Sequence, residues 1–395
     1  MILLRRPSNY EDQVNFMEKL QYRNVLAEAG FSLAEIEERT QCCFYEIFYG
    51  PDRFYHEAGA DMAYLEDTGN LDVRTEGMSY GMMMCVQMDR RAEFDRLWKW
   101  AKTYMYMTQG TNSGYFAWSV SPNGVPNATG PAPDGEEYFA MALFFASHRW
   151  GDREGIFCYS REARKLLHTC IHKEGSGPGR NMWDRRNHLI RFVPEKDFTD
   201  PSYHLPHFYE LFSLWADEED REFWMKAAAA SRAFLQRACH PETGLSAEYT
   251  TFDGKPFTEL QTVFGRHDWY YSDAYRTVAN IAMDYIWFGR SRGDKWHTET
   301  AEKLQRFFCE TAADHPRGIY SIDGTVLEGT ALHPVAITAT NAQAALASGE
   351  PLAGDALRCV REFWSTPMRR GVRRYYDNCL YMFAVLALGG NYRIY

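Results

Sequence analysis

The chain of 395 residues is 45% hydrophobic, which is enough to bury a large core, and its net charge of −10 argues against binding to nucleic acid or to an anionic membrane surface. No segment reaches the roughly 18 uninterrupted apolar residues of a spanning helix. The N-terminal sequence MILLRRP lacks the hydrophobic region of a secretory signal, and the nine cysteines include no CxxC pair. These features predict a cytoplasmic protein with free thiols.

Along the chain, two kinds of helical segment alternate. In the first kind, charged residues recur at helical spacing on one face, as in a helix with one solvated side. Such amphipathic helices are expected at residues 11–29, 33–48, 92–107, 162–172, 218–239, 298–312 and 355–364.

The second kind is apolar on nearly every side and is therefore expected to be buried all round. These segments are residues 76–88, 135–148, 203–215, 273–288, 335–347 and 375–388. Their starts recur roughly every 60 residues, which is typical of a repeated structural unit.

Six buried helices interleaved with exposed ones predict an all-α fold, an (α/α)6 toroid with an inner and an outer ring of helices. We expect one domain spanning residues 1–395. Strand patterns are short and lie in connections, at residues 114–120 and 189–193.

Acidic residues stand at the starts of three buried helices: Glu76, Asp134 and Asp273. If the inner helices run parallel, their N-termini meet at one end of the toroid, together with other polar residues that precede them. Burying a lone ionisable group is costly, so such positions are functional candidates. The alternative for each acid alone is a helix cap, which stabilises a helix by about 1 kcal/mol.

Paired carboxylates of this kind are typical of glycosidases, which need a proton donor and a second acid. Acids on opposite inner helices suit the wider spacing of the inverting class. The helix dipole favours an ionised Asp273 as the base, with Asp268 as a rival candidate, but it opposes a protonated Glu76. Burial or a neighbouring carboxylate such as Asp134 would have to overcome that effect.

Two pairs of histidines have a short spacing in the sequence. His204 and His207 have a suitable spacing, but Pro206 lies between them, and we expect packed or substrate-facing side chains. His168 and His172 lie four residues apart on an exposed helix, where we expect a solvated pair. We therefore expect no metal. The chain also has no Walker, GxGxxG or GxSxG motif, so no cofactor is implied.

The segments GNLDVRTEGMSYGMMM, PAPDGEEYFAMALFFAS and SDAYRTVANIAMDYIWF resemble the three acid-bearing motifs of glycoside hydrolase family 8. That resemblance implies an (α/α)6 toroid that inverts the anomeric configuration. It implies that Glu76 is the general acid, that Asp273 is the general base, and that Asp134 binds and distorts the sugar. Pro133 and Glu136 depart from the commoner family pattern and resemble the xylan-active branch.

Within that branch, the segment ALHPV around His333 resembles the loop of reducing-end xylose-releasing exo-oligoxylanases. The resemblance implies a substrate of β-1,4-xylo-oligosaccharides and release of xylose from the reducing end. The alternative for this segment is a helix that begins at a proline. Further candidate substrate-binding residues are Trp118 as a stacking platform, Tyr203, Arg276, Arg74 and Tyr80.

Three other functions remain open from the sequence. The nearest is an endo-xylanase or endoglucanase of the same family, which would need an open cleft at His333. The second is an (α/α)6 sugar isomerase or epimerase, which would use His204, His207 and His333. The third is a non-enzymatic oligosaccharide-binding protein.

Overall fold

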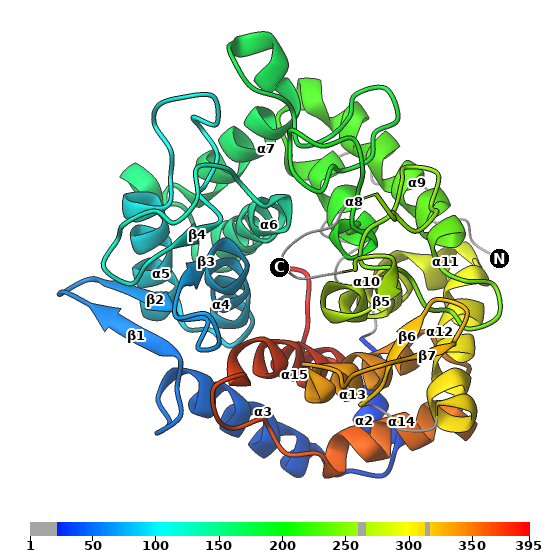
Figure 1. Ribbon diagram of the computed structural model, residues 1–395. Helices are drawn as coiled ribbons and strands as arrows, with labels where there is room; N and C mark the ends of the chain where they lie inside the picture. The colour runs from blue at the N-terminus through cyan, green and yellow to red at the C-terminus, as the bar shows by residue number, and fades with distance from the viewer. Residues whose placement is uncertain (1–21, 260–265, 313–316) are drawn as a thin grey trace.

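The computed structural model describes residues 22–259, 266–312 and 317–395. This part of the chain is mostly helical, as predicted, and its helices surround a common centre (Figure 1). The helices nearer the centre are α4 (Thr75–Gln87), α6 (Pro133–Trp150), α8 (Pro206–Trp215), α10 (Tyr275–Asp284), α13 (Pro334–Gln343) and α15 (Arg374–Leu388). Those on the outside are α3 (Leu33–Phe48), α5 (Arg91–Tyr104), α7 (Tyr159–Ser176), α9 (Arg221–Ala238), α12 (Trp296–Arg306) and α14 (Gly354–Ser365).

Burial follows the two sequence patterns. Every residue of α4 is buried except Glu76, and every residue of α10 and α15 is buried apart from Arg374 at the start of α15. The outer helices bury one face only; α3, for example, buries Ile36, Phe44 and Ile47 while its charged residues face outward. Apolar helices therefore form the core, and amphipathic helices cover it.

Short helical turns extend or join these helices. They are α2 (Val25–Glu28), η1 (Gly155–Phe157), η2 (Pro201–Tyr203), η3 (Glu218–Asp220), η4 (Ser272–Ala274), η5 (Tyr285–Gly289), α11 (Arg290–Arg292), η6 (Phe307–Thr311) and η7 (Ala344–Ala347). Two of them, η5 and η6, are π-helical continuations of α10 and α12. Hydrophobic periodicity does not distinguish such turns from the α-helix that they continue.

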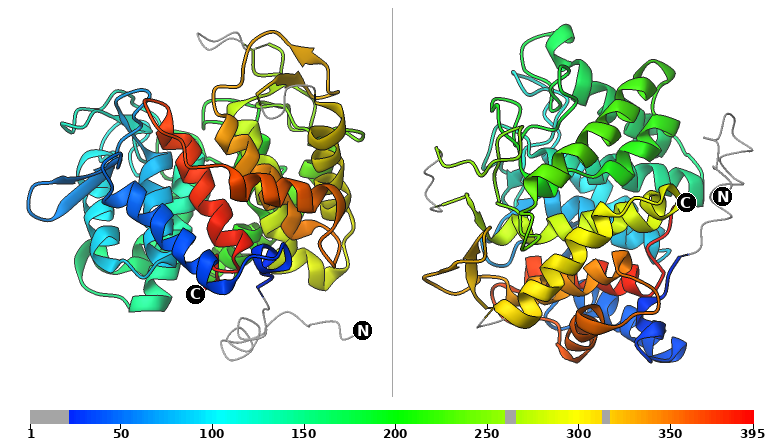
Figure 2. Two further views of the ribbon diagram at one scale, coloured as in Figure 1. Left: turned by 90° about the horizontal axis from the view of Figure 1, so that it is seen from below. Right: turned by 90° about the vertical axis from the view of Figure 1, so that its right-hand side faces the viewer.

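Three small antiparallel sheets lie in the connections. They pair β1 (Tyr55–Ala58) with β2 (Met62–Leu65), β3 (Val73–Arg74) with β4 (Ser119–Val120), and β5 (Trp269–Tyr270) with β6 (Ile319–Ser321) and β7 (Val326–Leu327). The strands β6 and β7 lie at the end of the molecule opposite the C-terminus (Figure 2, left).

The strand predictions were only partly right. The expected strand at 114–120 is reduced to Ser119–Val120, and the one at 189–193 is wrong, because Ile190 forms only an isolated bridge with Trp183. The β1–β2 hairpin was not predicted. The expected helix at 11–29 falls partly outside the described residues, and within them only Val25–Glu28 is helical.

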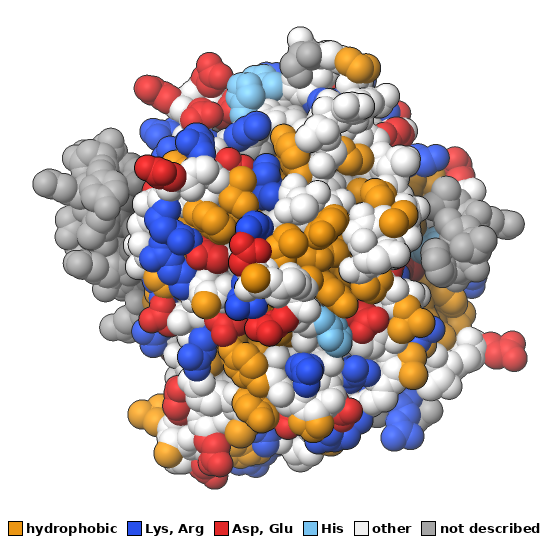
Figure 3. Space-filling view, turned by 90° about the vertical axis from the view of Figure 1, so that its left-hand side faces the viewer, with side chains coloured by type: hydrophobic (Ala, Val, Ile, Leu, Met, Phe, Trp, Pro, Cys, Tyr) orange, Lys and Arg blue, Asp and Glu red, His pale blue; other side chains and the backbone are white. Residues whose placement is uncertain are grey.

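The surface and the cysteines agree with the composition. Acidic and basic side chains alternate over the face drawn in Figure 3. None of the described helices is both long enough and apolar enough to cross a membrane. All nine cysteines lie in the described ranges and are free thiols, as expected.

Candidate active site

The first acid, Glu76, is placed by a strand that leads directly into a helix. Arg74 ends β3 and pairs with Ser119 of β4, and the Thr75 N–H donates to the Trp118 carbonyl at 3.0 Å. These backbone bonds fix the first turn of α4. The Glu76 side chain is 15% exposed, so it opens toward solvent from an otherwise buried helix.

Two glycines allow the neighbouring elements to approach Glu76 closely. A Cβ on Gly77 would lie 2.5 Å from the Tyr375 hydroxyl, and a Cβ on Gly135 would lie 2.5 Å from the Thr75 Cβ. Side chains at either position would push α15 or α6 away from α4. The GMSYG and PDGEE segments therefore carry glycine for packing reasons.

One buried guanidinium joins the three acids. Arg276 donates from Nη1 to Glu76 Oε2 at 3.2 Å and to Asp134 Oδ2 at 2.9 Å. Its Nη2 lies 2.9 Å from Asp273 Oδ1, one turn earlier in the chain. Arg276 Nη1 also donates to the Tyr80 hydroxyl at 2.8 Å. Residues almost 200 positions apart in the sequence thus meet around a single cation.

Three carboxylates sharing one cation have unusual electrostatics. Burial raises the pKa of Glu76 to about 7; the Asp134 and Asp273 charges add to the rise, and Arg276 opposes it. Burial is also the main cause that raises the pKa of Asp134. Because one guanidinium cannot neutralise three acids, a proton is retained in this site near neutral pH. The helix dipole at Glu76 is outweighed by desolvation.

Asp273 follows a strained residue. Ser272 has a φ of +37°, which is uncommon for a residue with a Cβ, and its carbonyl accepts a hydrogen bond from the Tyr376 hydroxyl at 3.0 Å. Strain of this kind is characteristic of functional sites. Asp268, the rival base, is instead bound by Arg266 through two hydrogen bonds of 2.8 and 2.6 Å.

The predicted substrate-binding residues occupy different parts of the site. Tyr80 contacts Arg276 directly, and the Tyr203 ring lies 5.6 Å from the Arg276 guanidinium carbon. Arg74 forms ion pairs with Asp67 and Asp72, at 3.2 and 3.1 Å.

Trp118 is the most open of the predicted binding residues. Its side chain is 38% exposed, and the guanidinium of Arg74 lies 5.3 Å from its ring centroid. An exposed indole braced by a cation on one side can offer its remaining surface to a ligand.

His333 belongs to a second polar cluster beside the acids. Its Nδ1 lies 2.9 Å from Asp377 Oδ2, and Arg369 donates both to Asp377 at 2.6 Å and to the Leu332 carbonyl at 2.5 Å. The His333 ring packs on Tyr376, which links it to the Ser272 carbonyl. The segment around His333 is therefore bound to α15 and, through Tyr376, to the residue that precedes Asp273.

His204 and His207 are core residues. His204 bonds Thr199 and Ser231, each at 2.9 Å, and stacks on Phe234. His207 is fully enclosed, and burial lowers its pKa to about 3. Of the two roles expected from the sequence, packed or substrate-facing, both residues have the packed one.

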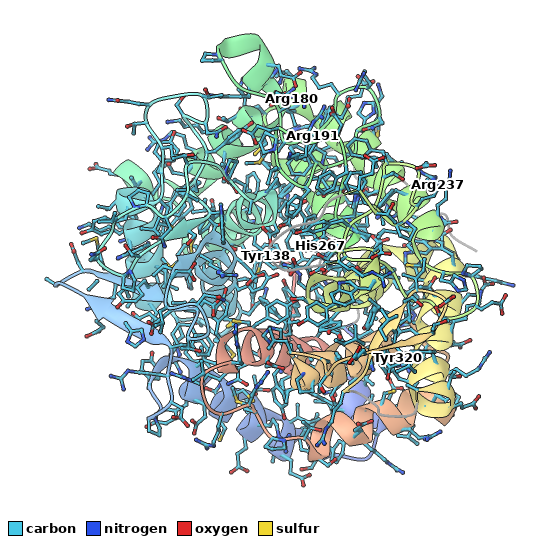
Figure 4. The ribbon with its side chains drawn as sticks, viewed as in Figure 1. Tyr138, Arg180, Arg191, Arg237, His267 and Tyr320 are labelled. Carbon is cyan, nitrogen blue, oxygen red and sulfur yellow. The ribbon has the colours of Figure 1, made fainter. Side chains whose placement is uncertain are left out.

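Three functional candidates were missed. Tyr375 donates to Glu76 Oε1 at 2.8 Å; it stands at the start of the sixth buried helix, where the rule that found the acids could have found it. Asp200 is fully buried with Oδ2 unpaired, and burial together with the Asp273 charge raises its pKa well above the usual range. The third is Glu248: burial raises its pKa to about 7, and its Oε2 lies 3.0 Å from His267 Nδ1. His267 and Tyr138 of α6 both lie near the centre of the circle of helices (Figure 4).

With this geometry established, comparisons with known proteins are informative. Residues 53–390 match the family described as "Glycosyl hydrolases family 8". This chain belongs to that family.

The similarity extends over nearly the whole chain. A reducing end xylose-releasing exo-oligoxylanase of Halalkalibacterium halodurans is 56% identical over 95% of both chains. The corresponding enzyme Rex8A of Paenibacillus barcinonensis is 52% identical over 95% of this chain and 97% of its own length. A solved structure of a Rex8A variant, complexed with an arabinofuranosyl-xylotetraose, superposes with a TM-score of 0.91, at 50% identity, over 96% of this chain and 98% of that one.

Proposed function

We propose that this protein hydrolyses β-1,4-xylo-oligosaccharides and releases xylose from the reducing end. The observation that carries the proposal is the meeting of Glu76, Asp134 and Asp273 around the buried Arg276. The similarity to exo-oligoxylanases over nearly the whole chain supports the choice of substrate.

In the proposed reaction, Glu76 protonates the glycosidic oxygen of the leaving sugar. A pKa of about 7 leaves this carboxyl largely protonated below neutral pH, as a general acid requires. Tyr375 holds Oε1, and Arg276 lies beside Oε2, so the carboxyl is oriented on both oxygens. As the bond to the leaving oxygen breaks, the proton passes from Glu76 to that oxygen.

Asp273 accepts a proton from the attacking water in the same step, so the anomeric configuration inverts. Its contact with Arg276 Nη2, at 2.9 Å, holds the carboxylate in place. Asp134 binds the hydroxyls of the sugar at the cleavage point and favours its distorted ring. Tyr203, Tyr80, Arg74 and Trp118 line the rest of the proposed substrate path.

We propose that the rigid segment around His333 closes the site on its leaving-group side. Arg369 and Asp377 fix both the Leu332 carbonyl and the His333 ring, so the segment is poorly suited to move aside for a long chain. This supports exo-action over the endo-acting alternative. An isomerase is less well supported, because His204 and His207 are committed to the core.

The finer structural predictions are part of the same proposal. The inner and outer helices support an (α/α)6 toroid that forms one catalytic domain. The nine free thiols support a cytoplasmic location, where a reducing environment keeps cysteines unpaired.

Proton NMR of xylotriose digestion tests the proposal, with the alditol of the same sugar in parallel. We expect xylose and xylobiose, a newly formed α-anomer, and no cleavage of the alditol. A new β-anomer would contradict the inverting assignment. Cleavage of the alditol would contradict reducing-end specificity and favour endo-action. Binding without cleavage would contradict the hydrolase itself.

A further inference from the structure

A separate polar cluster, formed by His168, His172 and Asp220, lies on the outside of the molecule, away from the three acids and from His333. It joins α7 to η3, the short turn that leads into α9, and both α7 and α9 belong to the outer layer (Figure 1). His168 Nδ1 lies 2.9 Å from Asp220 Oδ2, and His172 Nε2 lies 2.5 Å from Asp220 Oδ1. The two imidazole rings stack, with centroids 4.2 Å apart.

The Asp220 carboxylate is the unusual member of this cluster. Its side chain is only 2% exposed, while the two histidines are 41% and 30% exposed. Among the described residues, the two rings are its only side-chain partners. A buried carboxylate held only by imidazoles at the surface lacks a fixed cation, which burial normally requires.

We propose that His168, His172 and Asp220 bind a late first-row divalent metal ion such as Zn²⁺. One nitrogen from each ring and one carboxylate oxygen already lie within 4.8 Å of one another. Histidines four residues apart on one helix face, together with a carboxylate, form a ligand set that suits Zn²⁺. The exposed edges of the rings leave room for water as a further ligand.

Two neighbours of the cluster affect this site in opposite ways. The side chain of Glu219 is exposed, and its Oε1 lies 3.7 Å from His168 Nδ1. This carboxylate adds negative charge, which attracts a cation. Arg185 Nη1 lies 3.2 Å from His172 Nδ1, where it can only donate, so the ring proton lies on Nε2. When a metal binds at Nε2, the neutral ring carries its proton on Nδ1 instead, so Arg185, which is exposed, has to move aside.

The bound ion would fasten the C-terminal half of α7 to the start of α9. Since a ligand that binds only the folded state stabilises it, thermal stability should rise with Zn²⁺ concentration. This role is structural and independent of sugar hydrolysis. It replaces the solvated pair that the sequence suggested for His168 and His172.

Isothermal titration of the untagged, chelator-treated protein with ZnCl2 tests the proposal. We expect one ion per chain, with affinity about tenfold or more weaker in the double variant His168→Ala/His172→Ala. His240→Ala is the matched control, because it removes an imidazole at the opposite end of α9, and it should bind as the wild type does. Arg185→Ala should bind more tightly, because it removes the competing donor.

A second readout separates this site from adventitious binding. The midpoint of thermal unfolding should rise with ZnCl2 in the wild type and in His240→Ala, but not in the double variant. MgCl2, which prefers oxygen ligands, should give no rise in any of them. Equal Zn²⁺ affinity in the wild type and the double variant, or no binding to either, would overturn the proposal.

Discussion

The two ends of α10 carry the same kinds of side chain with opposite consequences. At its start, Arg276 is shared by Glu76, Asp134 and Asp273. At its end, Asp284 is bound by Arg232 through two hydrogen bonds, at 2.8 and 2.6 Å. The first cluster has three acids around one guanidinium. In the second, Arg232 also binds Glu210, and Glu210 is bound by Arg292 as well, so two acids share two guanidiniums.

The pKa shifts follow this difference. Burial acts on both ends of the helix, yet the pKa of Glu76 rises to about 7 while Arg232 holds the pKa of Asp284 below its usual range. His297 Nε2, 2.8 Å from Asp284, adds a further partner. The helix dipole predicts the reverse order, because it favours ionised acids at the start of a helix. The number of cations per acid therefore decides which buried acid keeps a proton.

The largest expected effect is on catalysis at the start of α10. In Glu76→Gln, the general acid is lost and kcat for xylotriose should fall by about 10²–10⁴-fold. The free energy of unfolding should not fall, because a neutral amide replaces a carboxyl that is largely protonated below neutral pH in a site with excess acid. Steady-state kinetics and thermal unfolding measure the two effects. A variant with near-normal kcat would mean that Glu76 is not the proton donor.

The corresponding variant at the other end of α10, Asp284→Asn, should lower stability and leave catalysis unchanged. Removing the Asp284 charge leaves the buried Arg232 with Glu210 as its remaining acidic partner, which costs about 3 kcal/mol of unfolding free energy. The fraction that remains folded should keep a normal kcat. Urea unfolding with activity measured below the transition checks both. Loss of kcat in fully folded Asp284→Asn would contradict the division between the two clusters.

The pH dependence of stability should differ between the clusters as well. The pKa of Asp284 is lowered in the folded state, so its contribution is fully present above its unfolded pKa of about 3.9 and is lost as the pH falls through the lower folded value. We expect the stability difference between wild type and Asp284→Asn to shrink on acidification below about pH 4. Unfolding free energies measured from pH 7 downward test this, and a constant difference would contradict it.

A smaller effect is expected from Tyr375→Phe. The phenol donates to Glu76, and losing a donor to a carboxylate raises its pKa, so the alkaline limb of kcat/KM should move upward by about one unit. We expect kcat to fall by about fivefold, which corresponds to about 1 kcal/mol. Tyr376→Phe, whose hydroxyl instead donates to the Ser272 carbonyl, is the control and should leave this limb in place. Equal shifts in both variants would argue against a specific role of Tyr375.

The smallest effect should come from Trp118→Ala. Loss of an exposed stacking surface weakens binding by about 1 kcal/mol, so KM for xylotriose should rise about fivefold with little change in kcat. Initial rates over a range of xylotriose concentrations measure this split. A fall in kcat with KM unchanged would place Trp118 in the core of the structure rather than in the substrate path.

Much of this arrangement could be predicted from the sequence. The outer helix α3 has the bounds that its periodicity predicted, and the inner helices begin within a few residues of their apolar runs. The acids were found because a charge entering an apolar helix is conspicuous. Arg276 was named from the sequence as a substrate-binding candidate; its contact with Asp273, one turn earlier, is local in the chain.

What the sequence could not provide depends on contacts between distant segments. That Arg276 also binds Glu76 and Asp134, and that Tyr375 binds Glu76, depends on how the inner helices pack against one another. Desolvation, which decides the pKa of Glu76, exists only after packing. The sequence did not predict the hairpin at Tyr55–Leu65 or the π-helical turns, because short strands and local changes of helix type leave little periodic signal.

The pH dependence of kcat/KM for xylotriose tests the central claim most directly, because it reports the pKa of the essential acid in the free enzyme. Because burial, together with the charges of Asp134 and Asp273, raises the pKa of Glu76 to about 7, kcat/KM should fall as the pH rises above about 7. A limb near the ordinary glutamate value of about 4.3 would show that Arg276 neutralises Glu76 after all. It would contradict the account of how the two ends of α10 differ.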